Sequence, residues 1–278
     1  MMCQWEALLG ILPLWMRQDV DKLGKDSLQQ LRLYLGSPPL LECKDRALKL
    51  SKAVTADDLK LCINAASRYS PWAAATSASG YITCVGGHRV GICGEVILQN
   101  GIPTGVTAIS SICIRVSRDI KAIAGKLSGI SGGVLMVGRP GSGKTTLLRD
   151  YIRIRSNENY ICVVDERREI FPRAGESICF DTGPRTDVLS GVSKQAGIEM
   201  ALRSMSPQVI AVDEITSAKD CRSIMQAGWC GVELVATAHA SGREELMKRP
   251  LYKPLVSSGL FQWLVILRED KTFRLERM

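Results

Sequence analysis

One octet constrains the fold of this chain more than any other feature of the sequence. Residues 138–145 read GRPGSGKT, a full match to the phosphate-loop pattern GxxxxGK[ST]. The apolar run Val134–Val137 precedes the octet, and the helix-like stretch 145–154 follows it. A strand, a glycine-rich turn and a helix in this order point backbone N–H groups and a helix N-terminus at one small volume, which suits phosphate. The sequence therefore predicts an α/β domain that binds a nucleotide.

Each polar residue of the octet has an expected role. Lys144 is expected to reach the β and γ phosphates, Thr145 to offer its hydroxyl to Mg²⁺, and Thr146 to meet the α phosphate. The expected cofactors are ATP and Mg²⁺. The predicted nucleotide-binding residues are Gly138, Arg139, Pro140, Gly141, Ser142, Gly143, Lys144, Thr145 and Thr146.

A pair of acids follows a second apolar run. Val209–Val212 is followed directly by Asp213 and Glu214. At the C-terminal edge of a strand, Asp213 can bind the metal through water, and Glu214 can polarise the attacking water. An acid pair that merely caps a helix is the competing interpretation.

Two further elements have weaker signals when taken alone. Residues 164–170 read VDERREI after the predicted strand 160–164, so their acids could face the γ phosphate. Residues 235–240 read VATAHA and place His239 at the tip of another strand. An ordinary loop histidine is the alternative interpretation of His239.

The second half alternates β-branched apolar runs with helix-like stretches, which indicates βαβ units and a parallel sheet flanked by helices. The expected closing element is a hairpin over 263–275 with its turn at 269–271. We place an α+β domain at 1–125 and the α/β ATPase domain at 126–278. The strands expected for the parallel sheet are 134–137, 160–164, 209–212 and 232–237.

The first half has a different pattern. Residues 4–70 have helical periodicity, clearest in 27–35, and Thr55 is the expected N-cap of a helix. Residues 81–98 predict a strand, a turn at Gly86-Gly87 and a second strand. A third strand, running through 112–116, is expected after the turn at 100–101. The prediction is an antiparallel meander behind a small helical bundle.

Composition limits the remaining possibilities. The longest apolar runs are far too short to cross a bilayer, and the N-terminal residues have no signal-peptide pattern. The ten cysteines form no CxxC pair, so we expect buried thiols in a reducing cytoplasm. The net charge of +8 fits either a solvated basic surface or a nucleic-acid or anionic-membrane partner.

Taken together, the four elements resemble those of the secretion ATPases, the hexameric RecA-like motors of type II and type IV secretion and pilus systems. The resemblance implies a RecA-like P-loop domain. The acidic segment 164–170 is similar to the family's Asp box, whose catalytic glutamate matches Glu169, and 237–240 is similar to its His box, which matches His239. The order Asp165-Glu166 is reversed relative to the common Glu-Asp, and Asp213 stands where many members have glycine.

A narrower resemblance covers nearly the whole chain. It is to the sporulation family of stage III protein AA, and GGHRVG at 86–91 together with RSMSP at 203–207 makes it specific. It implies an ATPase of the mother cell that works with the membrane complex joining mother cell and forespore. A homo-hexamer, cytoplasmic and peripheral at the inner face of a membrane, is expected. Other segments similar to that family are 31–33, 80–83, 109–115, 164–167, 185–189 and 212–215.

The resulting hypothesis assigns catalysis to Lys144, Glu214, Glu169 and His239, and the metal to Thr145 and Asp213. Ring motors of this kind usually complete the site with a cation from a neighbouring subunit. Two rival functions stay open: a nucleic-acid-dependent ATPase, and a scaffold that binds ATP with little hydrolysis. The candidate arginines are Arg89, Arg115, Arg118, Arg185 and Arg203.

Overall fold

The computed structural model describes residues 3–68 and 80–278, so the last two residues of the stretch 4–70 lie outside the described residues. By their internal contacts, the residues group into two units. The first contains Met1–Asp119 with Pro172–Phe180, and the second contains Ile120–Phe171 with Asp181–Met278. The sequence does not predict that the segment 172–180 belongs to the first unit, and the single domain boundary near residue 125 stays a prediction.

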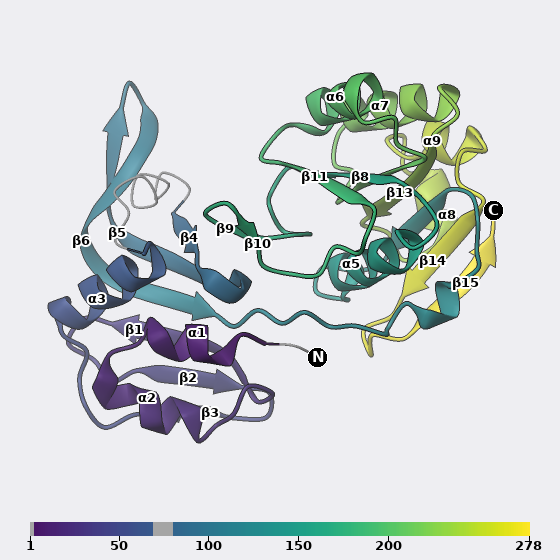
Figure 1. Cartoon of the computed structure of the whole chain (residues 1–278). Coiled ribbons are helices and arrows are strands. Elements are labelled where there is room, and N and C mark those ends of the chain that lie inside the picture. The colour runs from purple at the N-terminus through teal and green to yellow at the C-terminus, as the bar shows by residue number, and fades with distance from the viewer. Residues whose placement is uncertain (1–2, 69–79) are drawn as a thin grey trace. The chain divides into compact units, whose positions relative to one another are not determined.

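A six-stranded antiparallel sheet forms the frame of the first unit, in the order β3-β2-β1-β6-β5-β4 (Figure 1). Leu8, Met16 and Leu59 of its helices share one buried core with strand residues such as Leu31 and Ile114. The helices are α1 (Trp5–Gly10), α2 (Leu14–Asp21) and α3 (Ala56–Ala66). The strands are β1 (Leu28–Tyr34), β2 (Leu40–Cys43), β3 (Ala47–Lys49), β4 (Tyr81–Thr83), β5 (Arg89–Gln99) and β6 (Ile102–Arg115).

The helical prediction for residues 27–35 was wrong, because Leu28–Tyr34 form strand β1. Leu31 and Leu33 alternate into the core, as strand residues do, while Leu35 is 49% exposed. Leu28 is buried as well, three residues before Leu31, because the pairing of β1 with β2 shifts register between Leu28 and Gln30. Because of that irregularity, the buried residues Leu28 and Leu31 are three positions apart and not two. A spacing of three resembles the periodicity of a helix. Over the residues that the structure describes, the first unit is therefore a sheet packed with the short helices α1, α2 and α3 and not a helical bundle.

Other expectations for the first unit are confirmed. Thr55 caps α3, and its hydroxyl accepts the backbone N–H of Asp58 while the Asp58 carboxylate accepts the backbone N–H of Thr55. This reciprocal arrangement is a capping box. The turn at Gly86-Gly87 forms the short 3₁₀ helix η2 (Val85–Gly87) between β4 and β5.

A seven-stranded sheet forms the centre of the second unit, in the order β11-β8-β12-β13-β7-β14-β15. All strands are parallel except β15, which pairs antiparallel with β14. The strands are β7 (Val134–Val137), β8 (Ile161–Asp165), β11 (Thr186–Ser190), β12 (Val209–Val212), β13 (Glu233–Ala238), β14 (Trp263–Leu267) and β15 (Phe273–Arg277). The helices are α5 (Lys144–Arg155), α6 (Lys194–Ser204), α7 (Ala218–Trp229), α8 (Arg243–Lys248), α9 (Lys253–Ser257) and the 3₁₀ helix η3 (Gly125–Leu127).

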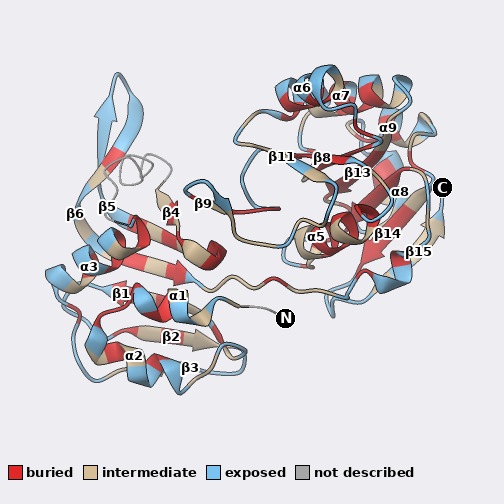
Figure 2. Cartoon of the chain, in the orientation of Figure 1, coloured by how far each residue is buried: buried red, intermediate tan, exposed pale blue. Residues whose placement is uncertain are grey.

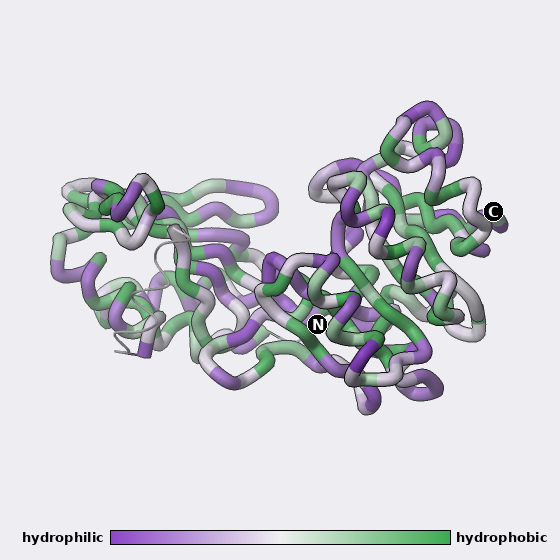
Figure 3. Tube along the Cα trace, turned by 90° about the horizontal axis from the view of Figure 1, so that it is seen from above, coloured by the Kyte–Doolittle hydropathy of each residue, from purple (hydrophilic) through white to green (hydrophobic). Residues whose placement is uncertain are grey.

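The predicted parallel sheet and its closing hairpin are confirmed, and the fold class is α/β with a smaller α+β unit. β7, β8 and β12 are buried along their whole length. Figure 2 shows buried residues in red on the central strands of this unit, and Figure 3 shows hydrophobic (green) stretches alternating with hydrophilic (purple) ones along the trace. Strand β11 was not predicted. The two-stranded hairpin of β9 (Arg173–Ala174) and β10 (Ser177–Ile178) was not predicted either.

The cysteines agree only in part with the expectation of buried thiols. Cys62, Cys84, Cys162 and Cys221 are buried, and burial raises the pKa of the Cys62 and Cys84 thiols to about 12. Cys93 and Cys230 are exposed, and the other four are intermediate. These buried thiols act as small apolar core residues.

The assignment of Leu28–Tyr34 to a strand can be tested with two leucines of the stretch 27–35. Leu31→Ala removes a fully buried side chain and should lower the free energy of unfolding by about 2–5 kcal/mol. Leu35→Ala, at a half-exposed position of the same sequence run, should cost less than about 0.5 kcal/mol. Urea unfolding measures both. Equal losses would contradict the strand, because a helix would place Leu28, Leu31 and Leu35 on one face.

Candidate functional site

The phosphate loop connects β7 to α5 in the conformation that its glycines allow. Gly141 and Gly143 have φ values of 76° and 98°, in the left-handed region that favours glycine, and Gly143 is the N-cap of α5. Lys144 is only 7% exposed, and its ammonium donates to the carbonyl oxygens of Gly138 (2.9 Å) and Arg139 (3.0 Å). Burial lowers the pKa of Lys144, while the charges of Glu214 and Asp213 oppose that shift.

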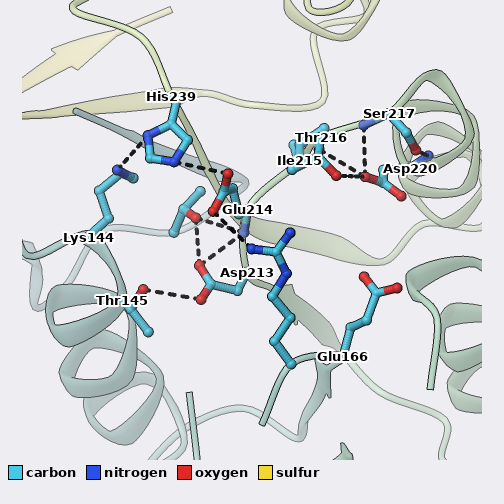
Figure 4. A network of polar contacts seen from close by, with 12 residues as sticks. Lys144, Thr145, Glu166, Asp213, Glu214, Ile215, Thr216, Ser217, Asp220 and His239 are labelled. Atoms are coloured by element: carbon cyan, nitrogen blue, oxygen red, sulfur yellow. Dashed lines mark hydrogen bonds and ion pairs between the residues drawn. The ribbon is translucent and has the colours of Figure 1, made fainter. Parts of the chain in front are cut away.

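Strand register brings the acid pair to this loop. Val212 of β12 lies opposite Ala236 of β13, and Ala238 of β13 lies opposite Val137 of β7. The residues just beyond the ends of β12 and β7 therefore emerge at one edge of the sheet. Thr145 Oγ1 donates to Asp213 Oδ2 at 3.1 Å across this edge (Figure 4).

His239 lies between the lysine and the glutamate of the site. Its Nδ1 is 3.0 Å from Lys144 Nζ, and its Nε2 is 2.9 Å from Glu214 Oε1 (Figure 4). An imidazole protonated on Nε2 alone fits both contacts, because Nδ1 then accepts from the ammonium while Nε2–H donates to the carboxylate. His239 thus bridges Lys144 and Glu214, which come from separate segments of the sequence.

The acidic segment after β8 contributes to the same region in two ways. Asp165 is 1% exposed, and its carboxylate accepts the backbone N–H groups of Glu169 and Phe171, both at 2.8 Å. Burial raises the pKa of Asp165, and these hydrogen bonds oppose the shift. Asp165 therefore holds the loop in shape and does not face outward. Glu166 and Glu169 line a narrow hollow together with Asp213 and Glu214.

Three contributors to the site were not assigned a role from the sequence. Lys194, only 4% exposed, lines the same hollow and pairs with Glu166 Oε2 at 2.6 Å. Arg167 Nη1 lies 3.8 Å from Glu214 Oε2. Thr237 is fully buried; its Oγ1 donates to Asp213 Oδ1 (2.7 Å) and accepts the backbone N–H of Glu214 (2.9 Å). The sequence contains no signal for Lys194, whereas Thr237 belongs to the segment similar to the His box.

The candidate arginines differ in their surroundings. Arg118 donates to the carbonyl oxygen of Lys25, and Arg185 donates to that of Asn157, both at 2.9 Å. The Arg89 guanidinium lies 4.1 Å from the centre of the Tyr81 ring. Arg203 is 3.9 Å from Glu199 on an exposed helix face. A role of any of them in a neighbouring subunit stays a prediction.

The sheet and its phosphate loop define the RecA-like P-loop fold, and solved secretion ATPases have similar structures. The X-ray structure of the Legionella pneumophila ATPase DotB is 18% identical, with a TM-score of 0.58 over 96% of this chain and 80% of that one. The pilus retraction motor PilT with bound ADP is 16% identical, with a TM-score of 0.60 over 95% of this chain and 78% of that one. At these identities the likeness shows the fold alone.

The chain belongs to the family described as sporulation stage III, protein AA, whose model matches residues 4–274. It is 35% identical to stage III sporulation protein AA of Bacillus subtilis over 94% of this chain and 90% of that protein. The protein SEEDLING PLASTID DEVELOPMENT 1 of Arabidopsis thaliana is 27% identical over 90% of this chain and 36% of its own length. The resemblance to this family is confirmed. Among residues 3–68 and 80–278, no helix has both the length and the apolar character of a membrane span.

The role of Thr237 leads to a prediction about stability. Thr237→Val keeps the shape of the side chain but leaves Asp213 Oδ1 and the Glu214 N–H each with one partner fewer. We expect a loss of about 1–3 kcal/mol in the free energy of unfolding, measured by urea unfolding. Thr237→Ser, which keeps the hydroxyl, should lose less. A valine variant as stable as the parent, or less affected than the serine variant, would contradict the role.

Proposed function

We propose that the chain is a Mg²⁺-dependent ATPase that acts as a motor in endospore formation. One observation carries the proposal: Thr145 Oγ1 lies 3.1 Å from Asp213 Oδ2 while the buried Lys144 ammonium lies in the adjoining loop. A hydroxyl and a carboxylate are oxygen ligands of the kind Mg²⁺ prefers, and a few protein oxygens suffice because phosphate oxygens and water complete its shell. The residues present therefore fit a Mg²⁺–nucleotide complex.

The residues divide the chemistry between them. Lys144 binds the β and γ phosphate oxygens, and Thr145 with Asp213 holds Mg²⁺, which when bound neutralises charge on the phosphates. Glu214 orients the attacking water and accepts its proton. Thr237 forms hydrogen bonds with the Asp213 carboxylate and with the backbone N–H of Glu214. These bonds position the two acids for the reaction.

Glu169 and His239 have supporting roles in this proposal. Glu169 lines the hollow beside Glu214 and helps to orient the water. His239 contacts both Lys144 and Glu214, so it is placed to detect whether a γ phosphate occupies the space near the ammonium. The exchange of the Lys144–His239 contact for a Lys144–phosphate contact would leave His239 free to bind the phosphate.

The place of the protein in the cell is inferred from its family. A relative 35% identical over nearly its whole length is a stage III sporulation protein, which supports a role in the same process. We infer that the chain works on the mother-cell side, at the cytoplasmic face of a membrane, with the complex that joins mother cell and forespore. The moved substrate is outside this inference.

A first prediction concerns Glu214→Gln. The amide keeps the shape of the side chain but cannot accept the proton of the water, so hydrolysis should fall on the order of 100-fold or more while ATP still binds. Phosphate release and equilibrium ATP binding are the two measurements. Glu158→Gln, on an exposed stretch after α5, is the matched control and should behave like the parent. Hydrolysis near the parent rate in Glu214→Gln would move the role to Glu169.

A second prediction concerns assembly. We infer a closed ring, with six protomers as in the motors that the sequence resembles, because repeated heterologous interfaces stop growing only when rotation closes them. Sedimentation velocity with MgATP should give a species of about six chain masses. A monomer at every concentration, with specific activity constant on dilution, would contradict the ring.

A further inference from the structure

A buried lysine lines the narrow hollow at the acids, and the proposed chemistry assigns it no step. Lys194 is the first residue of α6, and it is 4% exposed. It shares the hollow with Glu169, Asp213 and Glu214, which follow the strands β8 and β12. A cation therefore lies among the carboxylates that act on the attacking water.

The packing of α6 on β8 holds the lysine at this edge of the sheet. A Cβ at Gly197, three residues after Lys194, would lie 2.4 Å from Cγ1 of Val164. Glycine therefore lets the first turn of α6 approach the end of β8 more closely than a larger residue would. Val164 pairs with Val212 of β12, so the acids that follow both strands emerge beside that turn. The position of Lys194 is thus set by the fold.

This position has an electrostatic cost that the packing of the helix does not require. An ammonium removed from water needs other groups to replace its hydration. The N-terminal end of a helix carries partial positive charge, which repels a cation in the first turn, and the first turn of α6 contains no acidic residue. An apolar side chain would fill the same volume without this cost. A residue that breaks local rules in this way indicates a functional role.

Glu166 offsets part of the cost and leaves the ammonium able to bind more. Its Oε2 accepts from Lys194 Nζ at 2.6 Å, and among residues 3–68 and 80–278 it is the only hydrogen-bond partner of that ammonium. An ammonium has three N–H donors, so two remain for a molecule in the hollow. The Glu166 side chain is 39% exposed, so solvent reaches the carboxylate while the ammonium stays buried.

The hollow has the size and the polarity of a water site. Its volume of about 10 Å³ is the space of about one water molecule. A bound water needs about two to four polar partners, and the lining offers both kinds: Lys194 donates, while Glu169 and Glu214 accept. A phosphate group does not fit so small a volume.

We propose that Lys194 holds the water that attacks ATP in this hollow. The inference rests on the proposed function. The ammonium donates a hydrogen bond to the water oxygen, and that oxygen attacks the γ phosphorus with a lone pair. A proton of the water moves to the Glu214 carboxylate, the bond from the γ phosphorus to the bridging oxygen breaks, and ADP leaves with the electron pair. The charge of Lys194 stabilises the negative charge that develops on the attacking oxygen.

The test replaces the ammonium by an apolar group of similar length in the full chain. For Lys194→Met, phosphate release at saturating MgATP should fall at least about tenfold, while the dissociation constant for ATP stays within about twofold of the parent. The affinity for ADP with aluminium fluoride, which mimics the transferring phosphoryl group, should fall by a similar factor as the rate. Lys219→Met, at an exposed lysine in the first turn of α7, is the matched control and should change none of these values.

Two further measurements separate this role from a structural one. The melting temperature of Lys194→Met should equal or exceed that of the parent, because a buried charge at a helix N-terminus is removed. Glu166→Gln, whose amide oxygen still accepts from the ammonium, should keep hydrolysis within about threefold of the parent.

The contrary results are equally defined. Hydrolysis by Lys194→Met at the parent rate would overturn the role of Lys194. A lower melting temperature together with equal weakening of ATP and of ADP with aluminium fluoride would overturn it as well. If the methionine variant does not fold, Lys194→Gln carries the same comparison, and a parent rate in that variant contradicts the role. A parent chain that releases no phosphate would instead overturn the proposed function.

Discussion

The buried ammonium of Lys144 is the constraint on which the arrangement of the second unit depends. A cation removed from water is stable only where dipoles and charges replace its hydration. Two carbonyl oxygens of the loop and a ring nitrogen of His239 lie within 3.0 Å of it. The carboxylates of Glu214 and Asp213 raise the pKa of Lys144 against the effect of burial. The loop, the acid pair and the histidine therefore stabilise one another electrostatically.

Parallel pairing is what makes this convergence possible. β12, β13 and β7 are neighbours in the sheet, and all end at the same edge. Asp213, His239 and Gly138 directly follow these strand ends. Gly138 and His239 meet there although they are 101 residues apart in the sequence. Thr237, inside β13, links the register of the strands to the orientation of Asp213 and Glu214. Hydrogen bonds therefore hold the two acids at the place where charge must be positioned.

The sequence predicts the local parts of this arrangement and not its long-range contacts. The octet 138–145 specifies its own strand, turn and helix, and Val209–Val212 specifies a buried strand before the acids. The contact between Lys144 and His239 depends on the register of β7 with β13, which one sequence does not reveal. Lys194 opens an ordinary helix, and nothing in its neighbours distinguishes it from a surface lysine. In β1 the irregular pairing at Leu28 made a strand look helical.

The central claim is that the carboxyl edge of this sheet forms one Mg²⁺-dependent site for ATP hydrolysis. The most direct test is phosphate release by the purified parent chain over many turnovers, with Mg²⁺ and then with the metal removed by a chelator. We expect steady release that continues well beyond one phosphate per chain and stops without the metal. Tight ATP binding with no release beyond a single turnover, or release that does not depend on Mg²⁺, would contradict it.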